Sequence, residues 1–123
     1  MPATIKKTLV LGASDNASRY SFLAINKLRD HQHPVVAIGQ RNSVVADVNI
    51  SNEKIAVPDL DTVTVYLSPA NQKSYYDYIL QQSPKRVIFN PGAENEEFEE
   101  ILKDKGIQTI QACTLVLLGT GQY

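Results

Sequence analysis

Short apolar runs and amphipathic stretches alternate along the chain. The apolar runs are rich in β-branched residues, as is typical of buried strands, and lie at residues 8–11, 35–38, 63–67, 86–89 and 107–111. Between them, apolar residues three and four positions apart predict helices at residues 19–31, at residues 69–82 and in the segment that ends at Gly106. Strands and helices that alternate over short connections predict a parallel sheet covered on both faces.

Topology rules for such sheets narrow the expected fold. Right-handed helical crossovers predict an α/β fold with an open, doubly wound sheet of about five parallel strands in the order 3-2-1-4-5. The length of the chain leaves little room for a second lobe, so residues 1–123 are expected to form a single domain. Residues 44–58 stay ambiguous, with a small extended excursion as one interpretation. Residues 112–123 fit either a short strand or a turn of helix.

The spacing of apolar residues also predicts which helix faces are buried. In the first helix the stripe expected to pack on the sheet is Ser21, Ala24, Ile25 and Leu28. The second helix is expected to begin at Ser68, whose hydroxyl would cap it, with Pro69 at the first helical position. Its predicted buried face omits Tyr78 and consists of Tyr75, Tyr76, Ile79 and Leu80.

Composition argues against several classes of protein. The formal net charge is −1 and the basic residues are dispersed, so the electrostatic footprint of a nucleic-acid binder is absent. The longest apolar run, Leu115 to Leu118, is too short to cross a bilayer. The chain has a single cysteine and shows no signal-peptide pattern, which predicts a cytoplasmic location.

The turn after the first strand is the strongest candidate for a binding site. Ligands of doubly wound sheets bind beyond the carboxyl ends of the strands, near the switch point beside the first strand. Here a strand turns directly into a helix, whose first backbone amides have no intrahelical partner and can bind phosphate. The loop departs from the dinucleotide fingerprint at its second and third glycines. The residues expected at the ligand are Gly12, Ala13, Ser14, Asn16, Ser18, Arg19 and Tyr20.

The end of the second strand carries Gly39, Gln40 and Arg41 in place of the acid that binds the ribose of NAD. An arginine there favours a ribose that carries phosphate, because a guanidinium binds phosphate in bidentate fashion. Both NADP and coenzyme A (CoA) fit this expectation. Arg41 is equally compatible with a solvated loop cation.

Several motifs in order along the chain resemble those of the small stand-alone CoA-binding domain proteins, which are similar to the CoA-binding half of the succinyl-CoA synthetase alpha subunit. They are Gly12-Ala-Ser14 with Arg19-Tyr20, the segment Asp61 to Pro69, Asn90-Pro-Gly-Ala-Glu94, and Ala112-Cys-Thr114. The resemblance implies a Rossmann-like domain that holds CoA across the strand ends. It places the first turn at the diphosphate, Arg41 near the phosphorylated ribose, and Asn90, Pro91 and Gly92 along the crevice.

This chain departs from the family pattern at two points. Many relatives have Asn-Pro where Gly39-Gln40 stands, and the phosphorylated histidine of the synthetase has no counterpart. His31 and His33 are expected at the opposite edge of the sheet. Ser68 and Pro69 after the third strand and Cys113 after the fifth complete the predicted cofactor site. Cys113 is read either as a small buried hydrophobe or as a residue that forms a mixed disulfide with CoA under oxidation.

No candidate catalytic or metal-binding group emerges from the sequence. The acidic residues from Glu94 to Glu100 are interpreted as the start of a helix, where carboxylates complement the dipole. An aspartate is missing at the end of the third strand, which argues against a phosphorylated receiver. The sequence therefore favours a non-enzymatic carrier, sensor or partner module that holds CoA or acyl-CoA, with a protein partner or a homo-oligomer left open. An NADP-binding, oxidoreductase-like protein is the alternative.

Overall fold

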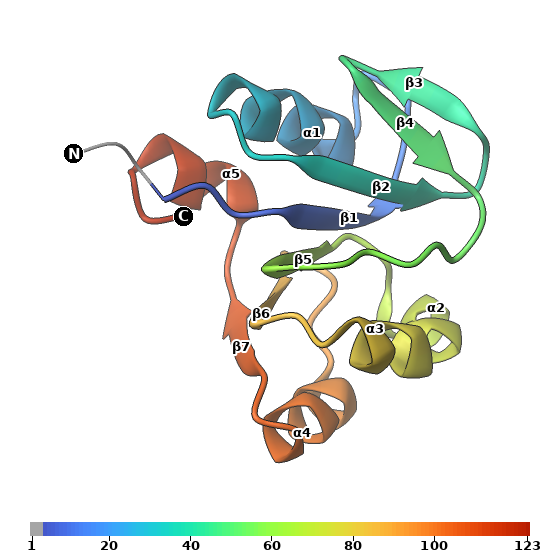
Figure 1. Cartoon of the computed structure of the whole chain (residues 1–123), viewed down its shortest axis with the longest axis vertical. Coiled ribbons are helices and arrows are strands. Elements are labelled where there is room, and N and C mark those ends of the chain that lie inside the picture. The colour runs from blue at the N-terminus through green and yellow to red at the C-terminus, as the bar shows by residue number, and fades with distance from the viewer. Residues whose placement is uncertain (1–3) are drawn as a thin grey trace.

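The computed structural model describes residues 4–123, which form one open sheet with helices on both faces (Figure 1). The strands follow the spatial order β3-β4-β2-β1-β5-β6-β7, and all neighbours are parallel except the antiparallel pair β3 and β4. Their bounds are Thr8–Ala13 (β1), Val35–Gly39 (β2), Ser43–Val45 (β3), Val48–Ser51 (β4), Thr62–Val65 (β5), Arg86–Phe89 (β6) and Gln108–Gln111 (β7).

The predicted α/β class with a doubly wound sheet is confirmed, but the strand count and the predicted order are wrong in detail. The third predicted strand, now β5, lies beside β1 in the middle of the sheet and not at its edge. The edge position belongs to the ambiguous segment, which forms the β3-β4 hairpin and pairs with β2 through β4. With β4 as the third parallel strand along the chain, the parallel strands follow the doubly wound order 3-2-1-4-5-6.

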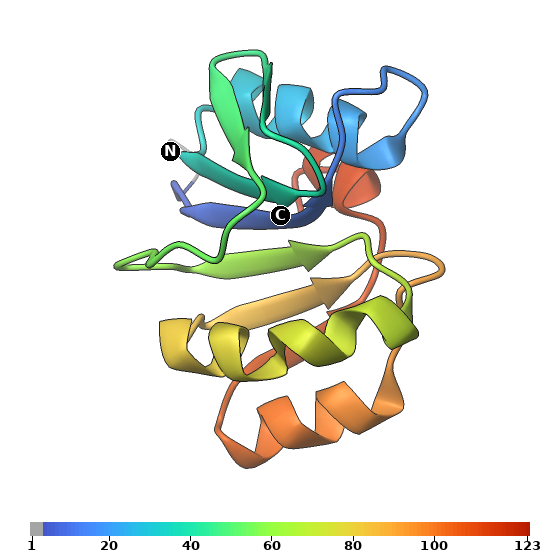
Figure 2. The ribbon, with the colours of Figure 1, turned by 90° about the vertical axis from the view of Figure 1, so that its right-hand side faces the viewer.

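The helices divide between the two faces of the sheet (Figure 2). Helices α1 and α5 cover one face, where Ile25, Leu28 and Leu118 pack against Val10 and Ala37. The α2–α3 segment and α4 cover the other face. The helical bounds are Tyr20–Asp30 (α1), Pro69–Gln72 (α2), Lys73–Tyr75 (η1, a 3-10 turn), Tyr76–Gln82 (α3), Glu96–Asp104 (α4) and Thr114–Gly119 (α5).

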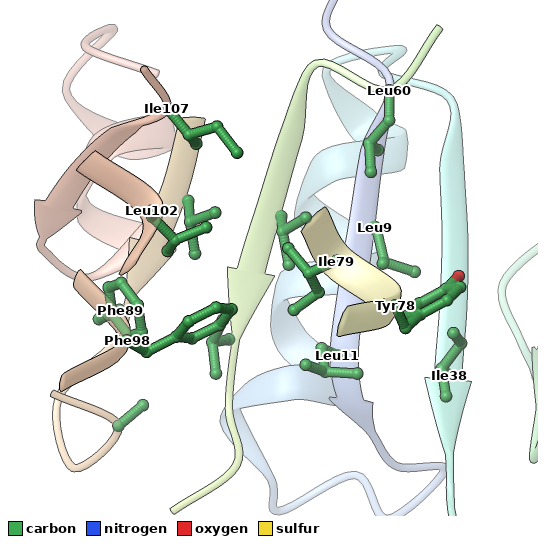
Figure 3. Close-up of a cluster of buried hydrophobic side chains, with 14 of the residues drawn as sticks. Leu9, Leu11, Ile38, Leu60, Tyr78, Ile79, Phe89, Phe98, Leu102 and Ile107 are labelled. Atoms are coloured by element: carbon green, nitrogen blue, oxygen red, sulfur yellow. The ribbon is translucent and has the colours of Figure 1, made fainter. Parts of the chain in front are cut away.

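The larger core cluster lies under α3 and α4 (Figure 3). Phe98 of α4 is fully buried and meets Phe89 of β6 edge to face, with ring centroids 6.0 Å apart. Ile79 of α3 packs in the same cluster as Leu9 and Leu11 of β1. All four predicted stripe residues of α1 are buried as expected.

The segment predicted as one helix over residues 69–82 is broken by the 3-10 turn. The break changes the phase of the helix, so Tyr78, predicted to be off the buried face, is 6% exposed and its hydroxyl donates to the carbonyl of Ile55. Tyr75 and Tyr76 are only partly buried against the core. Ser68 occupies the N-cap position of α2, but its side chain makes no capping bond. Within residues 4–123, no helix is long and apolar enough to cross a membrane.

Candidate functional site

A pocket of about 790 Å³ opens beyond the carboxyl ends of β1, β2 and β5. Its volume falls in the range of small-molecule and cofactor sites, roughly 300–1,000 Å³. One wall comes from residues 12–16 and 19–21, a second from residues 38–41 with Ser43 and Asn52, and a third from Tyr66, Leu67, Tyr75 and Pro91. The pocket therefore lies at the switch point, where the chain leaves β1 in one direction for β2 and later returns on the other side as β5.

Two glycines allow the strand ends to converge at this pocket. Gly12 has a φ of +90° and lies where the register of β1 against β2 shifts. A β-carbon there would lie 3.2 Å from the backbone nitrogen of Leu67 and 3.1 Å from its side chain. At Gly39 a β-carbon would meet the carbonyl oxygen of Ala13 at 2.3 Å. Any side chain at Gly39 would force the ends of β1 and β2 apart.

Helix α1 presents an uncapped start to the pocket. Its N-cap residue is Arg19, and no side chain caps the first turn. The preceding loop is held by its own side chains: Asn16 N–H donates to Ser14 Oγ at 3.0 Å, and Ser18 N–H donates to Asn16 Oδ1 at 3.0 Å. The Ser14 hydroxyl keeps its own proton for an outside acceptor. The amides of the first turn and the positive end of the dipole favour negative charge at this place.

Arg41 supplies a second positive group to the same pocket. It follows β2, and its side chain is 81% exposed. Its Nη2 donates to Asp15 Oδ1 at 3.3 Å, and both residues line the pocket. This ion pair joins the loop after β1 to the loop after β2.

The third wall is less polar. Leu67 and Tyr75 belong to the core face covered by α3, whereas Tyr66 packs against the core under α1 and α5. Burial raises the pKa of Tyr66 to about 12, so its phenol stays neutral at physiological pH. The Tyr66 hydroxyl is buried and has no hydrogen-bond partner within residues 4–123.

Asn90, at the end of β6, is bound inside the protein. Its Nδ2 donates to Thr64 Oγ1 at 2.7 Å and to the Val65 carbonyl at 2.9 Å, while its Oδ1 accepts from Thr114 N–H at 2.9 Å. The side chain is 2% exposed. Asn90 thus fastens β5, β6 and the start of α5 to one another, and it leaves Pro91 as the member of the turn that lines the pocket.

The structure gathers most of the predicted site residues in this one pocket. Those that line it are Gly12, Ala13, Ser14, Asn16, Arg19, Tyr20, Gly39, Gln40, Arg41 and Pro91. Other predicted residues lie at the same edge of the sheet but do not line the pocket: Ser18, Ser68, Pro69, Asn90, Gly92 and Cys113. Cys113 is partly buried and is the N-cap residue of α5, and the Gly92 amide donates to Glu94 Oε1 at 2.8 Å.

Sequence reasoning missed eight residues that line the pocket: Asp15, Ser21, Ile38, Ser43, Asn52, Tyr66, Leu67 and Tyr75. Asp15 lies within the predicted turn, and Tyr66 and Leu67 end the third predicted strand, so position alone could have indicated these three. Asn52 follows β4 and lies in residues 44–58, which the sequence leaves ambiguous. Tyr75 lies in the 3-10 turn, which the sequence did not predict.

The two histidines of the chain lie away from the pocket. His31 follows the far end of α1, and the buried His33 accepts a hydrogen bond at Nδ1 from Lys6 N–H at 3.0 Å, just before β1 begins. Both histidines are therefore at the edge opposite the pocket, as predicted. Among the described residues, no group of three or more His, Cys, Asp or Glu side chains is arranged to hold a metal ion.

Comparison with known proteins identifies the family. A protein-family model described as a CoA binding domain matches residues 6–119. The chain belongs to this CoA-binding domain family. The matched residues include the start of α1 and Arg41, which both line the pocket. A search of curated proteins gives no match.

Solved structures share the family fold along almost the whole chain. One, described as the crystal structure of an uncharacterized protein, is 48% identical, with a TM-score of 0.95 over 98% of this chain and 99% of its own. A Thermus thermophilus protein, cell-free ID.343, is 22% identical with a TM-score of 0.84, covering 97% of this chain and 91% of its own. A hypothetical protein from Pyrococcus horikoshii OT3 is 19% identical with a TM-score of 0.82, covering 91% and 80%. The last two similarities show the fold alone.

Proposed function

We propose that this protein binds CoA or acyl-CoA in the pocket beyond the carboxyl ends of β1, β2 and β5. It would hold the ligand without altering it, as a carrier, a sensor or a partner module. The observation that carries the proposal is the placement of two anion-binding elements in one pocket of a CoA-binding domain. The uncapped start of α1 and the Arg41 guanidinium both line the pocket, and CoA has a diphosphate and a separate phosphate on its ribose.

The residues present fit such a ligand. The first amides of α1, with the Ser14 hydroxyl, would bind the diphosphate. Arg41 would bind the phosphate on the ribose, which a guanidinium can grip with two N–H donors. The apolar groups of Ile38, Leu67 and Tyr75 offer a surface for the uncharged parts of the molecule. The bound cofactor would supply a thiol that carries acyl groups as thioesters.

The character of the pocket supports holding over catalysis. Its charged lining residues are Asp15, Arg19 and Arg41, and Asp15 is paired with Arg41. The lining includes no His, Cys or Lys side chain, which are common choices for a general base or a nucleophile. We also propose that the protein is cytoplasmic. Its ligand would be a small molecule, and it would have no nucleic-acid or membrane partner.

NADP is the second candidate, because its ribose phosphate would suit Arg41 equally well. Thermal unfolding of the protein with CoA, acetyl-CoA, NADP and NAD tests the choice. A ligand at a hundred times its dissociation constant stabilises by about 2.7 kcal/mol. We expect CoA and acetyl-CoA to raise Tm and NAD to leave it unchanged. A rise with NADP but none with CoA would reverse the assignment.

A further inference from the structure

The ion pair between Arg41 and Asp15 lies inside the pocket proposed to take a phosphorylated ribose. Arg41 Nη2 and Asp15 Oδ1 are 3.3 Å apart, and the two side chains are 81% and 40% exposed. Within residues 4–123, neither side chain makes another hydrogen bond or ion pair. The guanidinium therefore already has a carboxylate partner at the place where a phosphate would arrive.

The loops on either side do not depend on this pair for their shape. The loop after β1 is held by the bonds among Ser14, Asn16 and Ser18. The loop after β2 is fastened to the end of β4, where Asn52 N–H donates to Asn42 Oδ1 at 2.9 Å. The pair can consequently open by side-chain rotation, without a rearrangement of either loop.

We propose that Asp15 is an internal counter-ion, which occupies Arg41 while the pocket is empty and is displaced by the phosphate of the ligand's ribose. This inference rests on the proposed function. An exposed, single-contact pair is weak, whereas a guanidinium binds a phosphate through two charge-assisted hydrogen bonds. The arriving phosphate also repels the Asp15 carboxylate. Phosphate binding and the Arg41–Asp15 contact therefore oppose each other.

The consequence for binding is specific to the ribose phosphate. Asp15 lowers the affinity for CoA, because opening the pair opposes binding. A ligand without the ribose phosphate leaves the pair in place and is not opposed in this way. Asp15 would thus keep the affinity for CoA below the limit that Arg41 could reach alone, which suits a protein that must release its ligand.

Titration calorimetry of the Asp15→Asn variant with CoA and with 3'-dephospho-CoA tests the proposal. The variant keeps the size of the side chain and removes its charge. Since exposed pairs contribute about 0.2–1 kcal/mol, we expect CoA to bind about 1.4- to fivefold more tightly. Dephospho-CoA should gain clearly less. The difference should shrink at about 0.5 M salt, which screens exposed charges.

Within residues 4–123, a second Arg–Asp ion pair offers a control with the same change of charge. Arg29 Nε contacts Asp47 Oδ1 at 2.8 Å, between the last turn of α1 and the β3-β4 turn, and neither residue lines the pocket. Asp47→Asn changes the net charge by the same amount and should leave both dissociation constants unchanged. In an Arg41→Ala background, Asp15→Asn should lose its preferential gain for CoA.

The outcomes separate this inference from the function on which it rests. Failure of the wild-type protein to bind CoA would reject the proposed function. If CoA binds but Asp15→Asn leaves its dissociation constant unchanged, improves both ligands equally, or matches Asp47→Asn, then the internal counter-ion is rejected and the proposed function stands.

Discussion

The α-carbon of Gly39 faces the carbonyl oxygen of Ala13 so closely that a β-carbon would lie 2.3 Å from that oxygen. The contact lies at the junction of β1 and β2, where both strands end at the pocket. The wall of the pocket and the register of two central strands therefore depend on the absence of one side chain.

Replacement of Gly39 by alanine should damage both stability and binding. The added methyl group must push the two strand ends apart, and such overpacking costs about 1–3 kcal/mol. Urea unfolding measures the loss, and the increase in Tm with CoA should shrink in parallel. Gly119→Ala is the control, because only the flexible end of Lys27 lies near that position. Wild-type stability and binding in Gly39→Ala would contradict this account.

Removal of the Asn90 side chain should destabilise the edge of the sheet that carries the pocket, although Asn90 does not line the pocket. Asn90→Ala leaves the buried Thr114 N–H without its acceptor, and it removes one of two hydrogen bonds from Thr64 Oγ1 and from the Val65 carbonyl. We expect a loss of about 1–3 kcal/mol in urea unfolding, since a buried group left unsatisfied costs about that much. The exposed Asn71, whose amide donates to Ser68 Oγ, serves as comparison, and Asn71→Ala should stay within about 0.5 kcal/mol. Equal effects from the two variants would refute the role given to Asn90.

The stability of the protein should fall below neutral pH because of His33. Burial lowers the pKa of His33, and the positive charges of His31, Lys6 and Arg86 add to the shift. The unfolded chain therefore binds a proton at a higher pH than the folded chain does. The stabilisation from neutral His33 is present above the unfolded pKa of about 6.5 and is lost as the pH falls through the lower folded value.

Urea unfolding between about pH 7.5 and about pH 5.5 measures this loss. His33→Asn retains an acceptor for Lys6 N–H but does not titrate, so its stability should depend less on pH. The exposed His31 provides the control, and His31→Asn should retain most of the wild-type slope. A slope in His33→Asn as steep as that of the wild type would assign the pH dependence to other groups.

Loss of the Arg41 guanidinium should weaken CoA much more than 3'-dephospho-CoA. Hydrogen bonds to charged groups contribute about 1.5–3 kcal/mol, so Arg41→Ala should raise the dissociation constant for CoA by about one to two orders of magnitude. Lys105→Ala removes the same charge from an exposed site at the end of α4 and should change neither constant. Equal losses for both ligands in Arg41→Ala would remove Arg41 from the ribose phosphate.

Much of the fold could be predicted from local sequence because buried parallel strands are short, apolar and bounded by turn residues. Arg86–Phe89 has the predicted bounds, and α1 buries its predicted stripe. The strand order failed because it depends on the β3-β4 hairpin, whose strands are three and four residues long. Ala46, in the turn of this hairpin, has a φ of +54°. Glycine adopts this conformation readily but alanine rarely does, so the residue type does not predict the turn.

The site likewise has a part that the sequence predicts and a part that it does not. Glycines, a helix start and Arg41 were predictable because backbone chemistry after a strand follows from the sequence. Tyr75 reaches the pocket as the last residue of the 3-10 turn, which interrupts the helix predicted over residues 69–82. The Asn90 side chain points inward to partners on β5 and α5, and only tertiary structure brings those partners together.

The seam between β1 and β5 runs beneath the pocket, with walls from residues 12–52 on one side and residues 66–91 on the other. A molecule that contacts both sides would bind only the folded sheet, and it would therefore raise the free energy of unfolding. The resistance of the protein to unfolding would then rise with the concentration of that ligand.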